Sequence, residues 1–263
     1  GTFHQKVTEI AAEVVFPSMA DLGIETTTDK ITHHGYHRFY EHHFEKYRAR
    51  PNLRIFEIGL ARGSSMNLWC GYFPTAEIVG VDITLHPDCF PCELASGVYV
   101  YSGDAGQEDL LRRMIGTETQ KFDIIVDDGS HLPEHQLLAF NILFDAGLKF
   151  GGKYVIEDIE TSFWNDGILY NNVIDGNNIN IVEIFKSFAD VVNKEFFDPY
   201  LESQVESIEF GANCIILTKV SEDIHDHDGN PRHAQAGYYN RIYRMAEFVK
   251  GYNYGTNDGN DGE

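Results

Sequence analysis

The sequence is poor in cysteine and in basic residues, and it contains no long apolar run. Four cysteines in 263 residues are too few for a disulfide-stabilised scaffold. With 20 Lys and Arg against 41 Asp and Glu, the formal charge is −21, which argues against binding a nucleic-acid backbone. No run of about 18 apolar residues occurs, and no secretory signal pattern opens the chain. We therefore expect a cytoplasmic protein without nucleic-acid or membrane partners.

Two groups of metal-binding residue types are interpreted as structural. Cys89 and Cys92 have the spacing of a redox or zinc motif, but no second cysteine pair accompanies them. Five histidines occur between positions 33 and 43, without neighbouring cysteines or an ordered spacing. We interpret the cysteine pair as part of a loop and the histidines as surface residues. The aromatic residues of the same segment recur at helical spacing and predict a helix.

Short apolar runs alternate with helical patterns along most of the chain. The runs expected to form strands are residues 53–58, 77–82, 97–101, 122–127 and 151–156. Helices are expected over 3–16, 64–72, 107–116, 133–147 and 179–197. This alternation predicts a doubly wound, Rossmann-like α/β fold with a mostly parallel sheet. Two further runs, 205–210 and 213–219, are joined by Gly211 and Ala212 and predict a closing antiparallel hairpin.

The first strand ends in a turn suited to binding a small ligand. Glu57, Gly59 and Gly63 follow the apolar run, and Ser64 opens a helix whose N–H groups face the turn. Asp82 ends the second strand, where it is placed to accept both ribose hydroxyls of a nucleoside. Asp104 follows the third strand and is placed for the adenine amino group. The glycine spacing differs from that of dinucleotide-binding proteins and looks like the first motif of S-adenosylmethionine (SAM) methyltransferases.

Acidic residues gather after the fourth and fifth strands. Asp128, Glu157 and Asp158 are delivered by adjacent strands to one edge of the sheet. Three carboxylates at one place would repel one another without a cation, and their oxygens suit Mg²⁺ or another hard divalent ion. His131 follows Asp128 by three residues, where an imidazole could take a proton near neutral pH. We therefore predict Asp128, Glu157 and Asp158 as metal ligands, His131 as the general base, and Asp128 also as part of the cofactor site.

These motifs together resemble the metal-dependent sugar O-methyltransferases of macrolide and tetracenomycin biosynthesis, and more distantly the cephalosporin hydroxylase-like proteins. The stretches that carry the resemblance are residues 28–36 (Thr-Asp-Lys, His34, Tyr36), 57–63, 126–131 and 151–158. The resemblance implies a class I methyltransferase fold, with SAM and Mg²⁺ as cofactors. It also implies magnesium binding by Asp128, Glu157 and Asp158, with His131 as base.

The resemblance covers about residues 26 to 220 and suggests three parts. We expect an N-terminal helical cap (1–50), a SAM-binding methyltransferase domain (51–220) and a partly disordered acidic extension (221–263). The aromatic helix of the cap is expected to cover the cofactor crevice. The related macrolide enzymes carry a further N-terminal domain, so the resemblance supports the reaction type better than the acceptor.

The expected function is SAM-dependent, divalent-metal-assisted O-methylation of a small-molecule hydroxyl, on a sugar or a glycosylated natural product. A catechol-type acceptor is an alternative, because adjacent hydroxyls would chelate the same ion. A non-catalytic SAM-binding partner subunit is another, although such a protein would not need His131. An NAD-dependent oxidoreductase fits the glycine spacing and the terminal hairpin less well. We expect a homo-oligomer, either a dimer or a tetramer.

Overall fold

The computed structural model describes most of the region between residues 16 and 221. The described residues are 16–87, 97–116, 120–164, 173–174, 177–178, 180–193 and 204–221. The predictions for the Cys89–Cys92 pair, for a helix over 3–16 and for the acidic extension past residue 221 therefore lie outside the described residues. Among the described residues, no helix has the length and apolar composition of a membrane span.

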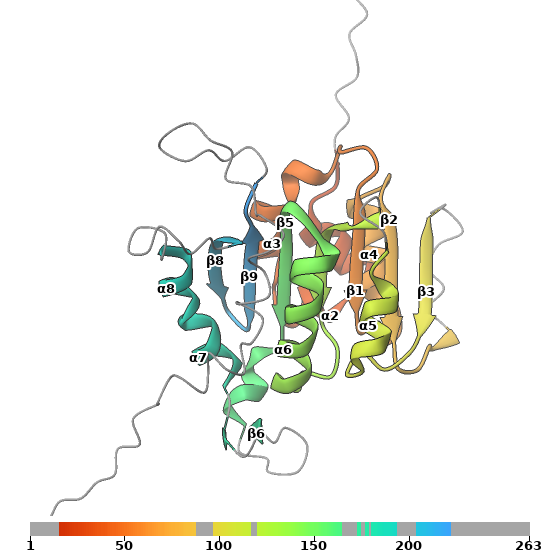
Figure 1. The fold of residues 1–263 in the computed structure, drawn as a ribbon. Coiled ribbons are helices and arrows are strands. Elements are labelled where there is room, and N and C mark those ends of the chain that lie inside the picture. The colour runs from red at the N-terminus through yellow and green to blue at the C-terminus, as the bar shows by residue number, and fades with distance from the viewer. Residues whose placement is uncertain are drawn as a thin grey trace, which may run out of the picture.

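A seven-stranded sheet forms the centre of the molecule, with the order β3-β2-β1-β4-β5-β9-β8 (Figure 1). The first five strands are parallel, and β9 and β8 run antiparallel at the end. The strands are β1 (Arg54–Ile58), β2 (Glu77–Asp82), β3 (Val98–Ser102), β4 (Phe122–Asp127), β5 (Leu148–Glu157), β8 (Val205–Gly211) and β9 (Cys214–Lys219). The predicted fold class, mostly parallel with a closing antiparallel hairpin, is confirmed.

Helices cover both faces of the sheet because the parallel strands are apolar on both sides. One face packs on α5 (Glu108–Met114), α6 (Pro133–Ile142) and α7 (Ile181–Lys186), through a core that includes Phe140 and Phe185. The other face packs on α1 (Met19–Thr26), α3 (His37–Phe44) and α4 (Ser64–Tyr72), around Trp69 and Tyr40. The short elements are α2 (Asp29–Thr32), η1 (Glu45–Tyr47), η4 (Leu143–Gly147), η5 (Ile159–Phe163), β6 (Val173–Ile174), β7 (Asn177–Asn178) and α8 (Phe188–Asn193).

Three predicted boundaries were wrong. The fifth strand begins at Leu148, because the chain passes through Gly151 in the left-handed region (φ 71°) without leaving the sheet. The helix expected over 179–197 is divided at Ser187, whose hydroxyl donates to the carbonyl of Ile184. The hairpin turns at Ala212 and Asn213 because Asn213 adopts φ 63°, which leaves Gly211 paired in the strand.

Candidate active site

The strand order reverses between β1 and β4, and the loops that follow these two strands touch. Gly59 and Gly63 have φ values of 85° and 82°, in the left-handed region that favours glycine. A Cβ atom on Gly59 would lie 1.9 Å from the carbonyl oxygen of Asp128. The glycine is therefore required for the β1 loop to pass directly against the β4 loop. Crevices at such a reversal are where open α/β sheets bind ligands.

A pocket of about 260 Å³ opens beside this contact, at the carboxyl ends of β1, β2, β3 and β4. Its lining includes Gly59, Asp82 and Asp104, three of the predicted cofactor residues. Asp127 also lines it, and its Oδ2 is buried without a hydrogen-bond partner among the described residues. Burial raises the pKa of Asp127 to about 7. The pocket therefore offers polar acceptors from three strand ends.

Asp82 lines the pocket and also holds the neighbouring loops in place through hydrogen bonds. Its Oδ2 accepts hydrogen bonds from the backbone N–H groups of Leu60 (2.7 Å) and Ala61 (3.0 Å). Its Oδ1 accepts from the N–H of Thr84. One carboxylate thus fixes the glycine turn to the end of β2. The Oδ1 of Asp104 accepts similarly from the N–H of Gly106 at 2.8 Å.

The remaining predicted cofactor residues lie outside the pocket lining. Glu57 is fully buried behind the turn, where its carboxylate accepts from Ser65 Oγ (2.9 Å) and Trp69 Nε1 (3.0 Å). Gly63 caps α4 and Ser64 begins it. Glu57 therefore supports the turn from below, and its role as a direct cofactor contact stays a prediction.

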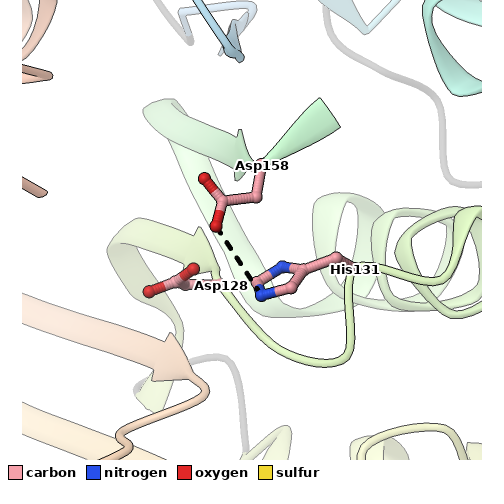
Figure 2. Close-up of side chains that lie close together, drawn as sticks. All are labelled: Asp128, His131 and Asp158. Carbon is pink, nitrogen blue, oxygen red and sulfur yellow. Dashed lines mark ion pairs between the residues drawn. The ribbon is translucent and has the colours of Figure 1, made fainter. Parts of the chain in front are cut away.

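Asp128, His131 and Asp158 come together beside the pocket, from the loop after β4 and the end of β5 (Figure 2). Each offers a ligand atom within 4.8 Å of the other two. His131 Nε2 lies 3.7 Å from Asp158 Oδ2, and Figure 2 shows the two side chains pointing toward each other. Within the described part of the chain, Nδ1 of His131 is buried without a hydrogen-bond partner. This trio, called the acidic centre below, can hold a cation or move a proton.

The backbone of the acidic centre is held in an uncommon conformation. His131 and Asp158 have φ values of 57° and 51°, in the left-handed region. The hydroxyl of Thr161 donates to the carbonyl of His131 at 2.7 Å, which ties η5 to the β4 loop. Non-glycine residues in this region cost about 1–3 kcal/mol each and are concentrated at functional sites.

Residues from distant parts of the chain orient Asp158. Its Oδ1 accepts from the hydroxyl of Tyr36 (2.6 Å) and from Asn213 Nδ2 (3.1 Å). His34 Nε2 lies 3.6 Å from the same oxygen, and the His34 ring stacks on Tyr36. His34 is thus half-buried beside the acidic centre, and its interpretation as a surface residue was wrong. The proximity of the Asp158 and Glu157 carboxylates, together with burial, raises the pKa of Tyr36.

Glu157 does not join the three converging side chains. Its carboxylate is 1% exposed and accepts from Lys30 Nζ (2.7 Å) and from the hydroxyl of Tyr40. Lys30 Nζ also contacts Asp128 Oδ2 at 2.5 Å and Glu57 Oε1 at 3.2 Å. Burial raises the pKa of Glu157 well above its usual value, although the Lys30 charge opposes that shift. Of the three predicted metal ligands, the structure brings Asp128 and Asp158 together and pairs Glu157 with a lysine.

The N-terminal helices do not cover the pocket as expected. No residue of the described N-terminal stretch, 16–50, is in the pocket lining. Lys30, Tyr36 and Tyr40 instead reach the carboxylates at the ends of β4 and β5. The aromatic face of α3 packs on Trp69 of α4, which places the segment on the opposite side of the turn.

Comparisons with known proteins agree with this geometry. A tetracenomycin-C 3'-O-methyltransferase that acts on a methoxy-rhamnosyl form, from Streptomyces olivaceus, is 37% identical over 139 residues, 49% of this chain and 33% of the relative. Mycinamicin VI 2''-O-methyltransferase from Micromonospora griseorubida is 34% identical over 158 residues, 56% of this chain and 37% of the relative. The chain resembles sugar O-methyltransferases. No family model matches.

The fold is that of class I methyltransferases. The MycE methyltransferase of the mycinamycin pathway, solved in complex with Mg, SAH and mycinamycin VI, matches with a TM-score of 0.66 at 25% identity. The match covers 83% of this chain and 58% of that one. The chain spans 33–39% of the length of the curated relatives it matches.

Lys30, His34 and Tyr36 lie in a stretch that carries the resemblance, but the sequence predicts no part in the site for any of them. It also gives no sign of the part that Asn213 takes. Lys30 lies 98 residues from Asp128 and 127 residues from Glu157 along the chain. No periodic pattern links such distant positions. Lys30 stands in a polar stretch, with Thr28 and Asp29 before it and Thr32 after Ile31, so the local sequence gives no signal that it is buried.

Proposed function

We propose that this chain carries a SAM-dependent O-methyltransferase activity toward a hydroxyl of a sugar or a glycosylated small molecule, assisted by a divalent metal ion. One observation carries the proposal: a histidine paired with an aspartate lies directly beside a pocket at the β1–β4 reversal. The names of the relatives, which act on rhamnosyl and olivosyl compounds, support the acceptor class. The MycE structure with Mg and SAH supports both cofactors.

The side chains of the acidic centre fit a hard divalent cation. Asp128 and Asp158 would hold the ion through carboxylate oxygens, and Glu157 lies next to them on the same edge. Mg²⁺ commonly uses one or two carboxylates and completes its octahedron with water. When bound, the ion would lower the pKa of the acceptor hydroxyl.

Residues of this chain would accept the proton and bind SAM. His131 would accept the proton of the hydroxyl, and Asp158 would orient the imidazole and stabilise its charged form. Asp82 and Asp104 would accept from the ribose and the adenine of SAM. The buried Oδ2 of Asp127 is available to accept from the amino group of the methionine part. The glycine turn lets the backbone approach the ligand closely.

Calorimetry with SAM, SAH and NAD tests the cofactor directly. We expect heat with SAM and SAH and none with NAD. An acceptor screen that measures SAH release, with rhamnosylated, other glycosylated and catechol compounds, then tests the reaction. NAD binding without SAM binding would overturn the proposal. SAM binding with no turnover on any acceptor would favour the partner-subunit alternative.

Replacing Asp82 by alanine should weaken SAM binding by about 1–3 kcal/mol, because the charge-assisted hydrogen bonds to the ribose are lost. Asp82→Asn is the matched variant: its amide oxygen can still accept from Leu60 and Ala61, so the turn is kept while the charge is lost. Titration calorimetry measures both variants. An Asp82→Ala protein that binds SAM as the native protein does would remove Asp82 from the cofactor site.

We infer that the acceptor binds on the β5 side, and the order of the strands supports this position. The pocket occupies the ends of β1, β2, β3 and β4, and the acidic centre follows at β4 and β5. The next element is η5, which ends at Phe163, a side chain that is 61% exposed. Aromatic rings of this kind pack against the apolar faces of ligands.

Phe163→Ala should therefore raise KM for the acceptor about threefold to tenfold, since an aromatic contact contributes about 0.5–1.5 kcal/mol. SAM affinity should stay unchanged. Tyr99→Ala is the control, because Tyr99 is similarly exposed (49%) but lies on β3 at the other end of the sheet. Steady-state kinetics with the acceptor found in the screen measure the effect. An equal KM in the two variants would contradict this placement.

We extend the proposal to organisation and location. We infer a cap (1–50), a SAM-binding domain (51–220) and an acidic extension (221–263), since the sheet begins at Arg54 and the resemblance ends at about residue 220. The buried thiol of Cys214, which forms no disulfide within the described residues, is consistent with a cytoplasmic protein. Exposed apolar residues at one end of the sheet, Ile83, Tyr99 and Tyr101, favour a homo-oligomer. Light scattering of the purified protein tests the oligomer.

A further inference from the structure

Lys30 places a positive charge in the position where the acidic carboxylates meet. Its side chain is 1% exposed, and its ammonium contacts Asp128, Glu157 and Glu57 within 3.2 Å. These three carboxylates come from the ends of β1, β4 and β5, so the lysine joins the three central strands. With three carboxylates this close, the geometry favours the charged ammonium.

Lys30 and the candidate metal site have one carboxylate in common, that of Asp128. Asp128 belongs to the acidic centre, and its Oδ2 lies 2.5 Å from Lys30 Nζ. A divalent ion bound by Asp128 would sit near the ammonium, and like charges a few ångströms apart repel strongly in a buried place. A divalent ion bound by Glu157 would compete with Lys30 more directly for the same carboxylate, because Glu157 is only 1% exposed.

We infer that Lys30 is a resident cation beside the acidic centre: it holds Asp128 together with Glu157 and Glu57 when no metal is bound, and it lowers the affinity of the centre for the divalent ion. This inference rests on the metal part of the proposed function. A lysine suits the role, because its ammonium is a compact charge on a flexible four-carbon stem that can swing when a second cation arrives. The backbone of Lys30 is fixed meanwhile, since its carbonyl accepts from the N–H of Tyr36 at 2.7 Å.

Lys30→Met tests the inference through metal binding and stability rather than turnover. In EDTA, the variant should melt at a lower temperature than the native protein, because three carboxylates are left without their counter-charge. Its dissociation constant for Mg²⁺, measured by calorimetry without substrate, should fall about tenfold as the nearby positive charge is removed. Saturating Mg²⁺ should then recover more of the melting temperature in the variant than in the native protein.

Lys153→Met is the matched control. Lys153 is also buried, on the same strand as Glu157, but it donates to Thr218 and contacts no residue of the acidic centre in the described structure. Its Mg²⁺ affinity should equal that of the native protein. If Lys30→Met fails to fold, the double variant Lys30→Met/Glu57→Gln removes one charge of each sign and keeps Asp128, Glu157 and Asp158. It should still bind Mg²⁺ more tightly than the native protein.

The outcomes separate the two claims. Native protein that binds Mg²⁺, with Lys30 variants that bind it equally or more weakly, would overturn the inference about Lys30 alone. Native protein that binds no divalent ion by calorimetry would overturn the metal assignment in the proposed function, and the inference with it.

Discussion

Replacing His131 by alanine is expected to lower turnover about 10²- to 10⁴-fold, the usual range for the loss of a general base. The reason is the geometry of the acidic centre: His131 Nε2 lies 3.7 Å from Asp158, and its Nδ1 has no protein partner among the described residues. The imidazole thus has beside its Nε2 a carboxylate that would stabilise the protonated ring. SAM affinity should change little, because His131 is not in the pocket lining as described.

The histidine-rich N-terminal segment provides the control for this variant. His42 is exposed on α3, and its replacement by alanine should leave both turnover and SAM binding at native values. Turnover should be measured by SAH release at saturating SAM, with binding followed separately by calorimetry. A His131→Ala enzyme within a few-fold of the native rate would mean that another group takes the proton.

Removal of divalent ions is expected to abolish turnover, and added Mg²⁺ is expected to restore it. Asp158→Asn should raise the Mg²⁺ concentration needed for half-maximal rate, and excess Mg²⁺ should partly restore activity. Glu157→Gln is expected to differ from Asp158→Asn in the stability of the protein. Glu157 is buried against Lys30 and Tyr40, so its replacement should also lower the melting temperature of the metal-free protein.

The chelation experiment requires a test that the fold survives. The circular dichroism spectrum of the EDTA-treated protein should match that of the untreated protein, because Lys30 supplies a counter-charge to the carboxylates. Full turnover in EDTA would remove the metal from the mechanism and would leave Asp128 and Asp158 as acceptor contacts.

The parallel core of the fold could be predicted from the sequence because each strand is an apolar run ended by an acid or a glycine. The strand ends also predict which loops share an edge, which is why Asp128, Glu157 and Asp158 were expected at one edge of the sheet, with His131 near Asp128. Boundaries were harder where a single backbone conformation decides them. Gly151 and Asn213 both adopt positive φ, and only the surrounding sheet determines whether such a residue ends a strand or continues it.

The direction of each side chain at the site could not be predicted from the sequence. Glu157 is the last residue of β5, whereas Asp158 follows the strand in a left-handed conformation (φ 51°), so the alternation of the strand does not extend to it. Glu157 contacts Lys30 and Tyr40, while Asp158 points to His131. Which acid meets which cation depends on contacts from residues 30–40, and these contacts are set by tertiary packing.

The contact between the Tyr36 hydroxyl and the carbonyl of Asn213 joins positions 177 residues apart. The Tyr36–Asp158 and Lys30–Glu157 contacts span 122 and 127 residues. Closing such long loops costs chain entropy before any contact rewards it, so nonlocal pairs form slowly during folding. On the ribosome, the contacts that orient Asp158 therefore cannot be completed until Asn213 has emerged, whereas every residue of the pocket lining lies before position 140. The pocket lining and the residues that hold Asp158 thus leave the ribosome at different times.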